Sequence, residues 1–185
     1  EGIRLIDRLE TGENDAVVGI TASGRTPFVL AALGRARERG SVPIGLCTNA
    51  HSRLEEVCAV TIAPLVGPEV ISGSTRMKSG TAQKLVLNML STCAMIKMGK
   101  VYGNLMVDLR ASNQKLQDRA RRLVIHATGV GEKRAQQLLD RAGGQVKLAI
   151  LMEKSGLEAE AARDRLEQCR GHLAQAIAME EEKDV

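Results

Sequence analysis

Two glycine-containing segments place hydroxyl and basic side chains where they could hold an anion. In residues 20–33, ITASGRTPFVLAAL, the group Ser23, Gly24, Arg25 and Thr26 stands between an apolar run and a proline that can open a helix. The first amides of a helix are unpaired and carry a partial positive charge, which suits a phosphate. A threonine cap before a proline leaves the other amides of the turn free. We therefore predict that these four residues bind phosphate, with an ordinary strand-to-helix connection as the alternative.

The second segment, residues 67–84 with the sequence GPEVISGSTRMKSGTAQK, again places glycine, serine and threonine before a helical pattern. Two helix starts that each offer hydroxyls and a base suit a sugar phosphate: one holds the phosphate, and the other holds hydroxyl groups and presents an acid or base. The alternative is a purely structural loop in which Glu69 pairs with Arg76. The candidate substrate-binding residues here are Glu69, Ser74, Thr75, Arg76 and Lys78.

These segments are positioned by an alternation of strands and helices. Residues 16–21, 42–48 and 59–65 are short, apolar and rich in β-branched residues, a pattern typical of strands buried in a parallel sheet. Residues 27–40 between the first two form an amphipathic pattern that ends at a glycine. The predicted fold class is α/β, a parallel sheet sandwiched by helices, with ligands bound beyond the carboxyl ends of the strands.

The second half of the chain changes to helical patterns alone. Residues 81–98 are apolar on most sides, which predicts a buried helix at a subunit interface and therefore a homodimer. Four further helical patterns from residue 113 onward each end at a glycine, which predicts a small bundle. We expect one domain over residues 1–108, a helical domain over 112–179 and a charged tail over 180–185.

Composition excludes several classes of function. Phe28 and Tyr102 are the only aromatic residues, so a sugar is not expected to stack on an aromatic platform. The net charge of +4 comes from 26 basic and 22 acidic residues that are interspersed, which argues against a nucleic-acid partner. No apolar run is long enough to span a membrane, so we expect no membrane partner.

The cysteines and histidines do not form a recognisable metal or disulfide pattern. Four cysteines without CxxC spacing predict reduced thiols in a cytoplasmic protein, and Cys47 in particular is expected to be buried and inert. His51 is expected on a loop surface, His126 near a helix end and His172 without a partner. We predict no metal site.

The two glycine-containing segments also carry a family resemblance. ASGRTP (22–27) together with GPEVISGSTRMKSGTAQKLVLNML (67–90) resembles the sugar isomerase (SIS) fold and, within it, the N-acetylmuramic acid 6-phosphate etherase family, which shares this signature with glucokinase regulatory protein. MGKVYGNLMVDLRASNQKL (98–116) is similar to a further family segment. Residues 126–177 are similar to the UBA-like helical domain that closes family members.

The resemblance implies an enzyme that needs no metal and no cofactor. Etherases of this family cleave the D-lactyl ether of N-acetylmuramic acid 6-phosphate by elimination and hydration, and they yield N-acetylglucosamine 6-phosphate and D-lactate in cell-wall recycling. The family's phosphate loop and its two acid/base glutamates lie upstream of the region that resembles residues 1–10, and Glu1 matches neither motif. We therefore expect a chain that lacks the amino-terminal part of the family fold, with its catalytic residues upstream of Glu1, and that is inactive alone.

Two other functions are compatible with the sequence. A sugar-phosphate sensor without catalysis, similar to glucokinase regulatory protein, would control a partner protein, although that protein has a duplicated sugar-binding unit for which 185 residues have no room. UBA-like bundles also bind proteins, so the tail could be an interaction module. Its apolar faces are equally satisfied by packing within the protein or against a second subunit.

Overall fold

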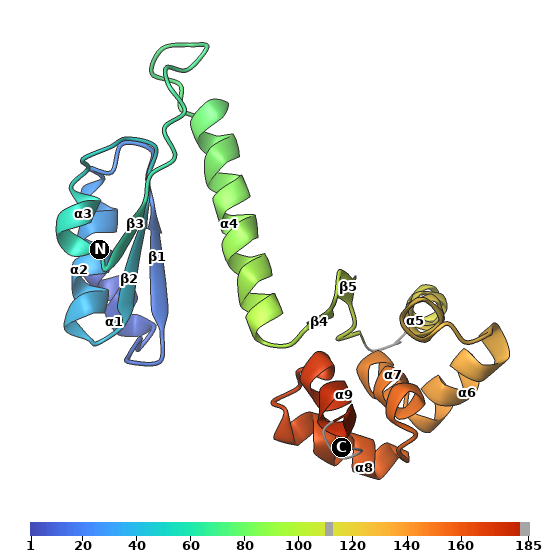
Figure 1. Ribbon diagram of the computed structural model, residues 1–185. Helices are drawn as coiled ribbons and strands as arrows, with labels where there is room; N and C mark the ends of the chain where they lie inside the picture. The colour runs from blue at the N-terminus through green and yellow to red at the C-terminus, as the bar shows by residue number, and fades with distance from the viewer. Residues whose placement is uncertain (110–112, 182–185) are drawn as a thin grey trace. The chain divides into compact units, whose positions relative to one another are not determined.

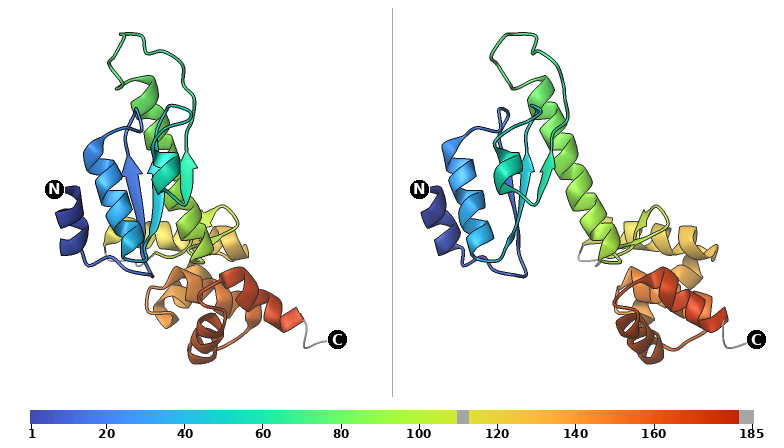
Figure 2. Two further views of the ribbon diagram at one scale, coloured as in Figure 1. Left: turned by 90° about the vertical axis from the view of Figure 1, so that its left-hand side faces the viewer. Right: turned by 60° about the vertical axis from the view of Figure 1, so that its left-hand side comes forward.

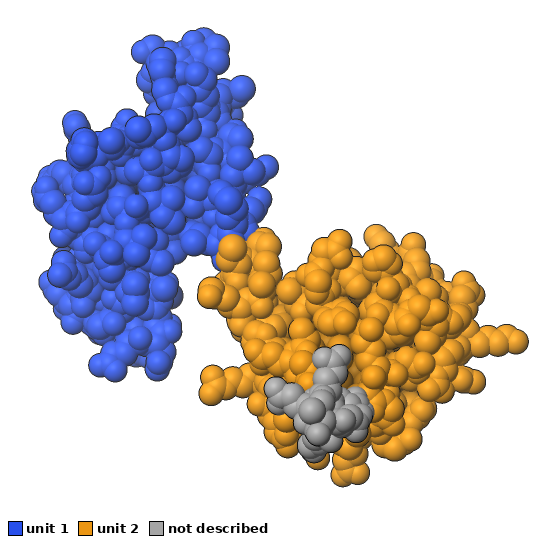
Figure 3. All heavy atoms as spheres, in the orientation of Figure 1, with its two compact units in different colours: residues 1–90 blue, residues 91–185 orange. Residues whose placement is uncertain are grey.

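The computed structural model describes residues 1–109 and 113–181, and it divides into two compact units. The first unit spans Glu1–Leu90 and the second spans Ser91–Val185. Figure 1 shows the elements along the chain, and Figure 3 colours the two units. The unit boundary falls within one helix, about twenty residues before the predicted domain boundary near 108–112. Residues 110–112 and most of the predicted charged tail lie outside the described residues.

The first unit is built on a three-stranded parallel sheet in the order β1-β2-β3. The strands are β1 (Ala16–Ile20), β2 (Val42–Leu46) and β3 (Val60–Ile62). Gly19 pairs with Gly45, which pairs with Thr61, so all three strands end at the same edge of the sheet. The loops that follow them gather at that edge (Figure 2). The structure confirms the predicted parallel sheet, and the third strand is shorter than predicted.

Three helices lie on one side of this sheet (Figures 1 and 2). They are α1 (Gly2–Arg8), α2 (Pro27–Glu38) and α3 (Leu54–Val57). Helix α1 packs against α2, while α2 and α3 pack on the face of the sheet. The sheet glycines let them approach closely, because a Cβ on Gly19 would lie 2.5 Å from Leu33 Cδ1 and one on Gly45 would lie 3.1 Å from Leu54 Cβ. Leu33, Cys47 and Leu54 form a small core between these layers.

The opposite face of the sheet is covered only in part. Within the first unit, the amino-terminal portion of α4 (Lys78–Lys97) runs along this side, where Ser79 and Val86 are buried. Val42 and Val60 remain 45% and 52% exposed on the sheet. Leu85 and Met89 on α4 are 51% and 57% exposed. A single chain therefore leaves these two side chains of α4 uncovered, and burial of the helix at a subunit interface stays a prediction.

The second unit has a hairpin followed by helices packed around one core. The hairpin consists of β4 (Val101–Tyr102) and β5 (Leu105–Met106), which pair antiparallel and were not predicted. The helices are α5 (Gln114–Thr128), α6 (Glu132–Arg141), α7 (Val146–Ser155), α8 (Ala159–Gln168) and α9 (Leu173–Glu181). Gly129 and Gly156 end α5 and α7 in the left-handed conformation that favours glycine, as predicted.

The core of this unit is centred on α7, whose apolar side chains are buried almost completely. Leu148, Ile150 and Leu151 are each at most 1% exposed, and side chains from all five helices and the hairpin pack around them. A helix that is buried on most sides is apolar in most positions, which explains why the sequence of α7 shows little amphipathic patterning. Within the described residues, no helix is both long and apolar enough to cross a bilayer.

Candidate sugar-phosphate site

The turn after β1 holds the first group of predicted site residues. Ser23, Arg25 and Thr26 are exposed there, and Ser23 Oγ accepts a hydrogen bond of 3.3 Å from the amide of Arg25. Thr26 is the residue before α2, but its side chain does not cap the helix. Its hydroxyl instead lies 2.7 Å from the hydroxyl of the buried Thr21. The predicted cap is therefore wrong, while Pro27 does occupy the first helical turn as predicted.

Gly24 is fixed in this turn by both backbone and packing. Its φ is +69°, and a Cβ at this position would lie 2.3 Å from Ser52 Cβ. A residue with a side chain would therefore meet a rigid neighbour as well as an unfavourable backbone conformation. The chain after β1 passes directly against the loop after β2, which keeps the turn compact.

Glu69 holds the start of α4. Its two carboxylate oxygens accept hydrogen bonds from the amides of Lys78 and Ser79, each 3.0 Å long. Both bonds lower the pKa of the Glu69 carboxyl, and the bond from the Lys78 amide has the larger effect. Lys78 Nζ donates to the carbonyl oxygen of Pro68 at 2.8 Å, so the ammonium group is held within the same loop. Glu69 bonds to backbone amides, which differs from the alternative in which it pairs with Arg76.

A chain of hydrogen bonds joins the loops after β1 and β2 to α4. Thr48 Oγ1 donates to the carbonyl oxygen of Ala22 at 3.1 Å and lies 2.8 Å from Ser79 Oγ. Since the one hydroxyl proton of Thr48 goes to Ala22, the hydroxyl of Ser79 donates to Thr48. Asn49 Nδ2 also donates to Ala22, at 3.3 Å. The edge of the sheet and the start of α4 therefore form one hydrogen-bonded network. Glu69 belongs to it because the amide of Ser79 donates to its carboxylate.

A cavity of about 220 Å³ lies beside this network. Its polar walls are hydroxyl groups, one amide and one carboxylate, while no lysine or arginine lines it. The rest of the wall is the backbone and apolar surface of the loop after β3. The cavity is lined by Thr48, Asn49, Val66, Gly67, Pro68, Glu69, Ser72, Gly73, Thr75 and Ser79. We call it the edge pocket.

The structure divides the predicted site residues into three places. Glu69 and Thr75 line the edge pocket. Ser74, Arg76 and Lys78 belong to the same loop but do not line it. The turn residues Ser23, Gly24, Arg25 and Thr26 also lie outside the pocket wall, on the loop that the Thr48 network joins to it.

Sequence reasoning missed four polar residues of the edge pocket: Thr48, Asn49, Ser72 and Ser79. A signal for two of them was present, because Thr48 and Asn49 directly follow a predicted parallel strand and therefore had to lie at its carboxyl end. Ser79 could not be found in this way. Its position depends on where α4 begins, and the helix begins three residues earlier than the predicted residue 81.

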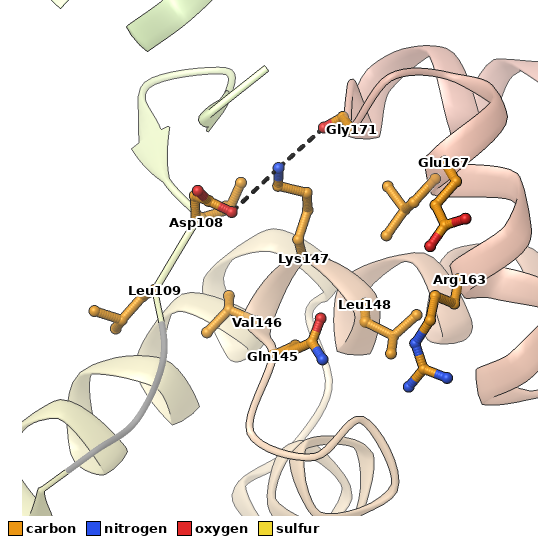
Figure 4. Close-up of a pocket in the computed structure, with 11 residues that line it drawn as sticks. Asp108, Leu109, Gln145, Val146, Lys147, Leu148, Arg163, Glu167 and Gly171 are labelled. Atoms are coloured by element: carbon orange, nitrogen blue, oxygen red, sulfur yellow. Dashed lines mark hydrogen bonds and ion pairs between the residues drawn. The ribbon is translucent and has the colours of Figure 1, made fainter. Parts of the chain in front are cut away.

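The second unit contains a larger cavity of about 440 Å³ with different chemistry (Figure 4). It has no serine or threonine in its wall, and Lys147 in it is already engaged by Asp108 at 3.3 Å and by the carbonyl oxygen of Gly171 at 3.0 Å. Burial raises the pKa of Asp108, but its bonds to Lys100 and Lys147 lower it more. Lys147 and Asp108 are thus already paired within the fold, which makes this cavity a poorer candidate for a sugar phosphate.

The remaining singled-out residues have structural surroundings. Cys47 is fully buried, as predicted, and its thiol donates to the carbonyl oxygen of Asn49. His51 lies exposed on a loop as predicted, and His126 lies in the last turn of α5. Among the residues that the structure describes, no group of three or more histidine, cysteine, aspartate or glutamate side chains is arranged to hold a metal ion.

Comparisons with known proteins agree with this fold. Residues 7–93 match the family model of the SIS domain. The chain is 55% identical over 169 residues to an N-acetylmuramic acid 6-phosphate etherase of Caldanaerobacter subterraneus subsp. tengcongensis, which covers 91% of this chain and 55% of that protein. The etherase of Rubrobacter xylanophilus is also 55% identical, over 89% of this chain and 55% of its own length.

A third relative bears the same name. The N-acetylmuramic acid 6-phosphate etherase of Yersinia pestis is 52% identical over 95% of this chain and 60% of its own length. The chain thus spans between one half and two thirds of the length of the curated relatives it matches. Residues 7–93 carry the match to the SIS domain, and the similarity to N-acetylmuramic acid 6-phosphate etherases extends over nearly the whole chain.

Proposed function

We propose that this chain carries one part of the substrate site of an N-acetylmuramic acid 6-phosphate etherase, a carbon–oxygen lyase of amino-sugar metabolism. In the reaction, a base takes the proton from C2 of the open-chain sugar, D-lactate leaves from C3, and water adds to the resulting unsaturated aldehyde. The products are N-acetylglucosamine 6-phosphate and D-lactate. No cofactor is required in this scheme, because the aldehyde makes the C2 proton acidic.

The observation that carries the proposal is the edge pocket at the carboxyl ends of parallel strands. Its hydroxyl, amide and carboxylate groups match the hydroxyl and acetamido groups of an amino sugar. The turn of Ser23, Gly24, Arg25 and Thr26, in which all but Gly24 are exposed, then supplies hydroxyls, amides and a guanidinium to the phosphate, in addition to the family's phosphate loop expected upstream of Glu1. The names of the relatives point to the same substrate.

The acid/base groups of the reaction are expected outside this chain. The edge pocket holds about 220 Å³, whereas small-molecule sites commonly hold roughly 300–1,000 Å³. Glu69 is the one carboxylate in its wall, and both of its oxygens already accept from backbone amides. Further walls and the family's two glutamates would complete the site, so we propose that the 185 residues alone do not turn over substrate.

We also propose that the protein is a cytoplasmic homodimer whose subunits meet along α4. Leu85 and Met89 are half exposed on this helix, and exposed apolar rows of this kind commonly mark an interface. The cytoplasmic location rests on cysteine usage, since all four thiols are free. Sedimentation of the chain and of its Met89→Glu variant tests the dimer: the variant should be monomeric, and an unchanged mass would contradict this interface.

Ligand binding and turnover test the proposed function together. In a thermal-shift titration, N-acetylmuramic acid 6-phosphate should raise the melting temperature at lower concentrations than inorganic phosphate does, because the pocket adds contacts to the sugar. An assay for D-lactate should detect no release by these 185 residues. Equal stabilisation by both ligands would contradict sugar recognition, and measurable lactate release would contradict the expected role of groups outside the chain.

A further inference from the structure

The start of α4 is already occupied by a carboxylate of the same chain. Among its first amides, those of Lys78 and Ser79 donate to the two oxygens of Glu69. Those amides are the groups that would otherwise hold an anion at a helix start. A phosphate bound to the Lys78 and Ser79 amides would have to displace the Glu69 carboxylate or lie next to it, and two adjacent anions repel each other.

No lysine or arginine lines the edge pocket. The charge of Lys78 acts on Glu69 from outside the pocket wall, and its Nζ is bonded to the carbonyl oxygen of Pro68. Lys78 and Arg76 do not line the pocket. The pocket wall therefore combines a negative charge with neutral hydroxyl and amide groups, a combination that accepts hydrogen bonds from neutral donors and disfavours phosphate.

A carboxylate oxygen has lone pairs to spare after accepting one hydrogen bond. Each Glu69 oxygen accepts one hydrogen bond from a backbone amide, which leaves capacity for a donor on the pocket side. Hydroxyl or acetamido N–H groups of an amino sugar are such donors. The amides of α4 keep the carboxylate in place and ionised while it accepts them, since they also lower the pKa of Glu69.

From these contacts we infer that Glu69 is a positioning residue that sets the direction in which the substrate binds. Its carboxylate closes the start of α4 to phosphate and directs the neutral, hydrogen-bond-donating part of the sugar into the edge pocket. The phosphate is thereby left to the turn of Ser23, Gly24, Arg25 and Thr26. This inference rests on the proposed function, since it assigns orientation within the same sugar-phosphate site.

The inference can be tested on the 185-residue chain by following backbone amides in nitrogen–proton NMR spectra. One titration uses the neutral sugar N-acetylglucosamine and the other uses inorganic phosphate. We expect the sugar to shift the amides of Thr48, Gly73 and Ser79, and phosphate to shift those of the Ser23–Thr26 turn. The Lys78 and Ser79 amides should not respond to phosphate in the unmodified chain.

Variants at Glu69 sharpen the test. In Glu69→Gln the sugar should bind about tenfold more weakly, the cost of a hydrogen bond to a charged group, and phosphate should begin to shift the Lys78 and Ser79 amides. Glu69→Asp should still exclude phosphate in part from the Lys78 and Ser79 amides, because it keeps the negative charge. Glu56→Gln, at an exposed glutamate on α3, serves as the matched control and should behave like the unmodified chain.

Each remaining outcome also decides between the proposals. If phosphate shifts the Lys78 and Ser79 amides of the unmodified chain, or if Glu69→Gln leaves both titrations unchanged, the role of Glu69 is wrong while sugar-phosphate binding stands. If neither ligand shifts any amide of the two loops, the inference fails together with the proposed function.

Discussion

The two units of the chain differ in how completely they bury their apolar surface. In residues 91–185, one continuous core runs through the whole unit around α7. In residues 1–90, most of the buried apolar residues form two small clusters on one side of the sheet, with Leu46 and Val86 buried outside them, while Val42 and Val60 stay about half exposed on the other side. The unit with the open face also has the edge pocket.

This difference suggests that the second unit contributes mainly stability and the first unit mainly binding. In a closed core, every buried apolar side chain stabilises the folded state, and the helices need no outside partner to cover them. A parallel sheet is normally covered on both faces, so a half-covered sheet leaves apolar surface for further chain or a second subunit. The first unit thus combines the proposed substrate site with the surfaces suited to assembly, and mutations in the two units should have different consequences.

The largest effect is expected in the closed core. Leu151 is fully buried on α7, so Leu151→Ala should lower the free energy of unfolding by about 3 kcal/mol through lost burial and a residual cavity. Leu65→Ala, at a 70% exposed residue of the first unit, should change it by less than about 0.5 kcal/mol. Urea unfolding followed by circular dichroism measures both values. Equal losses would contradict the contrast between the units.

The next effect concerns two glycines of the first unit. Gly24→Ala should destabilise the fold by about 2 kcal/mol, because the new Cβ meets Ser52 and the positive φ is strained. Gly34→Ala is the matched control, since it lies within α2 and its Cβ meets nothing within 4 Å. It should stabilise the helix by about 0.5–1 kcal/mol. Melting temperatures should therefore move in opposite directions, and a shared direction would show that the turn is not tightly packed.

A smaller effect is expected from the hydrogen bonds that join the loops. Thr48→Val removes the hydroxyl that donates to Ala22 and accepts from Ser79, so it should cost about 1–2 kcal/mol. Thr81→Val, at an exposed position of α4, should cost less than about 0.5 kcal/mol. Urea midpoints provide the comparison. If both variants unfold at the same midpoint, the Thr48 hydroxyl does not hold the loops together.

The smallest effect is a pH dependence from the Glu69 carboxylate. Its pKa in the folded chain lies below that in the unfolded chain, so its stabilising effect is fully present above the unfolded value of about 4.3. The effect is lost as pH falls through the lower folded pKa. Unfolding of the unmodified chain and of Glu69→Gln should therefore differ most at neutral pH and converge in acid. A difference that grows toward low pH would reverse the assigned sign.

The sequence predicted the regular elements well and the contacts between them less well. Strand and helix patterns located the sheet, and glycines located the ends of α5 and α7, because these features depend on neighbouring residues. The hairpin after α4 was not predicted, because strands of only two residues are too short to show an alternating pattern in the sequence. The role of Glu69 also could not be predicted, since its partners Lys78 and Ser79 depend on how the loop folds back onto α4.

Similarly, the sequence identified hydroxyl-rich loops but not which side chains were free to act. Thr26 was expected to cap α2, yet Thr21 takes its hydroxyl because the two residues flank the same turn. The sequence predicted that α4 is buried at a subunit interface, but it could not predict which side chains, such as Leu85 and Met89, a single chain leaves exposed.

The central claim is that the turn after β1 and the edge pocket hold opposite ends of one phosphorylated amino sugar. Calorimetric titration of the chain with N-acetylglucosamine 6-phosphate, repeated with Ser23→Ala, Glu69→Gln and Glu56→Gln, tests it most directly. We expect Ser23→Ala and Glu69→Gln to weaken binding of the sugar phosphate and Glu56→Gln to leave it unchanged. Binding of inorganic phosphate should be weakened by Ser23→Ala alone. Unchanged affinity for the sugar phosphate in both Ser23→Ala and Glu69→Gln would contradict the claim.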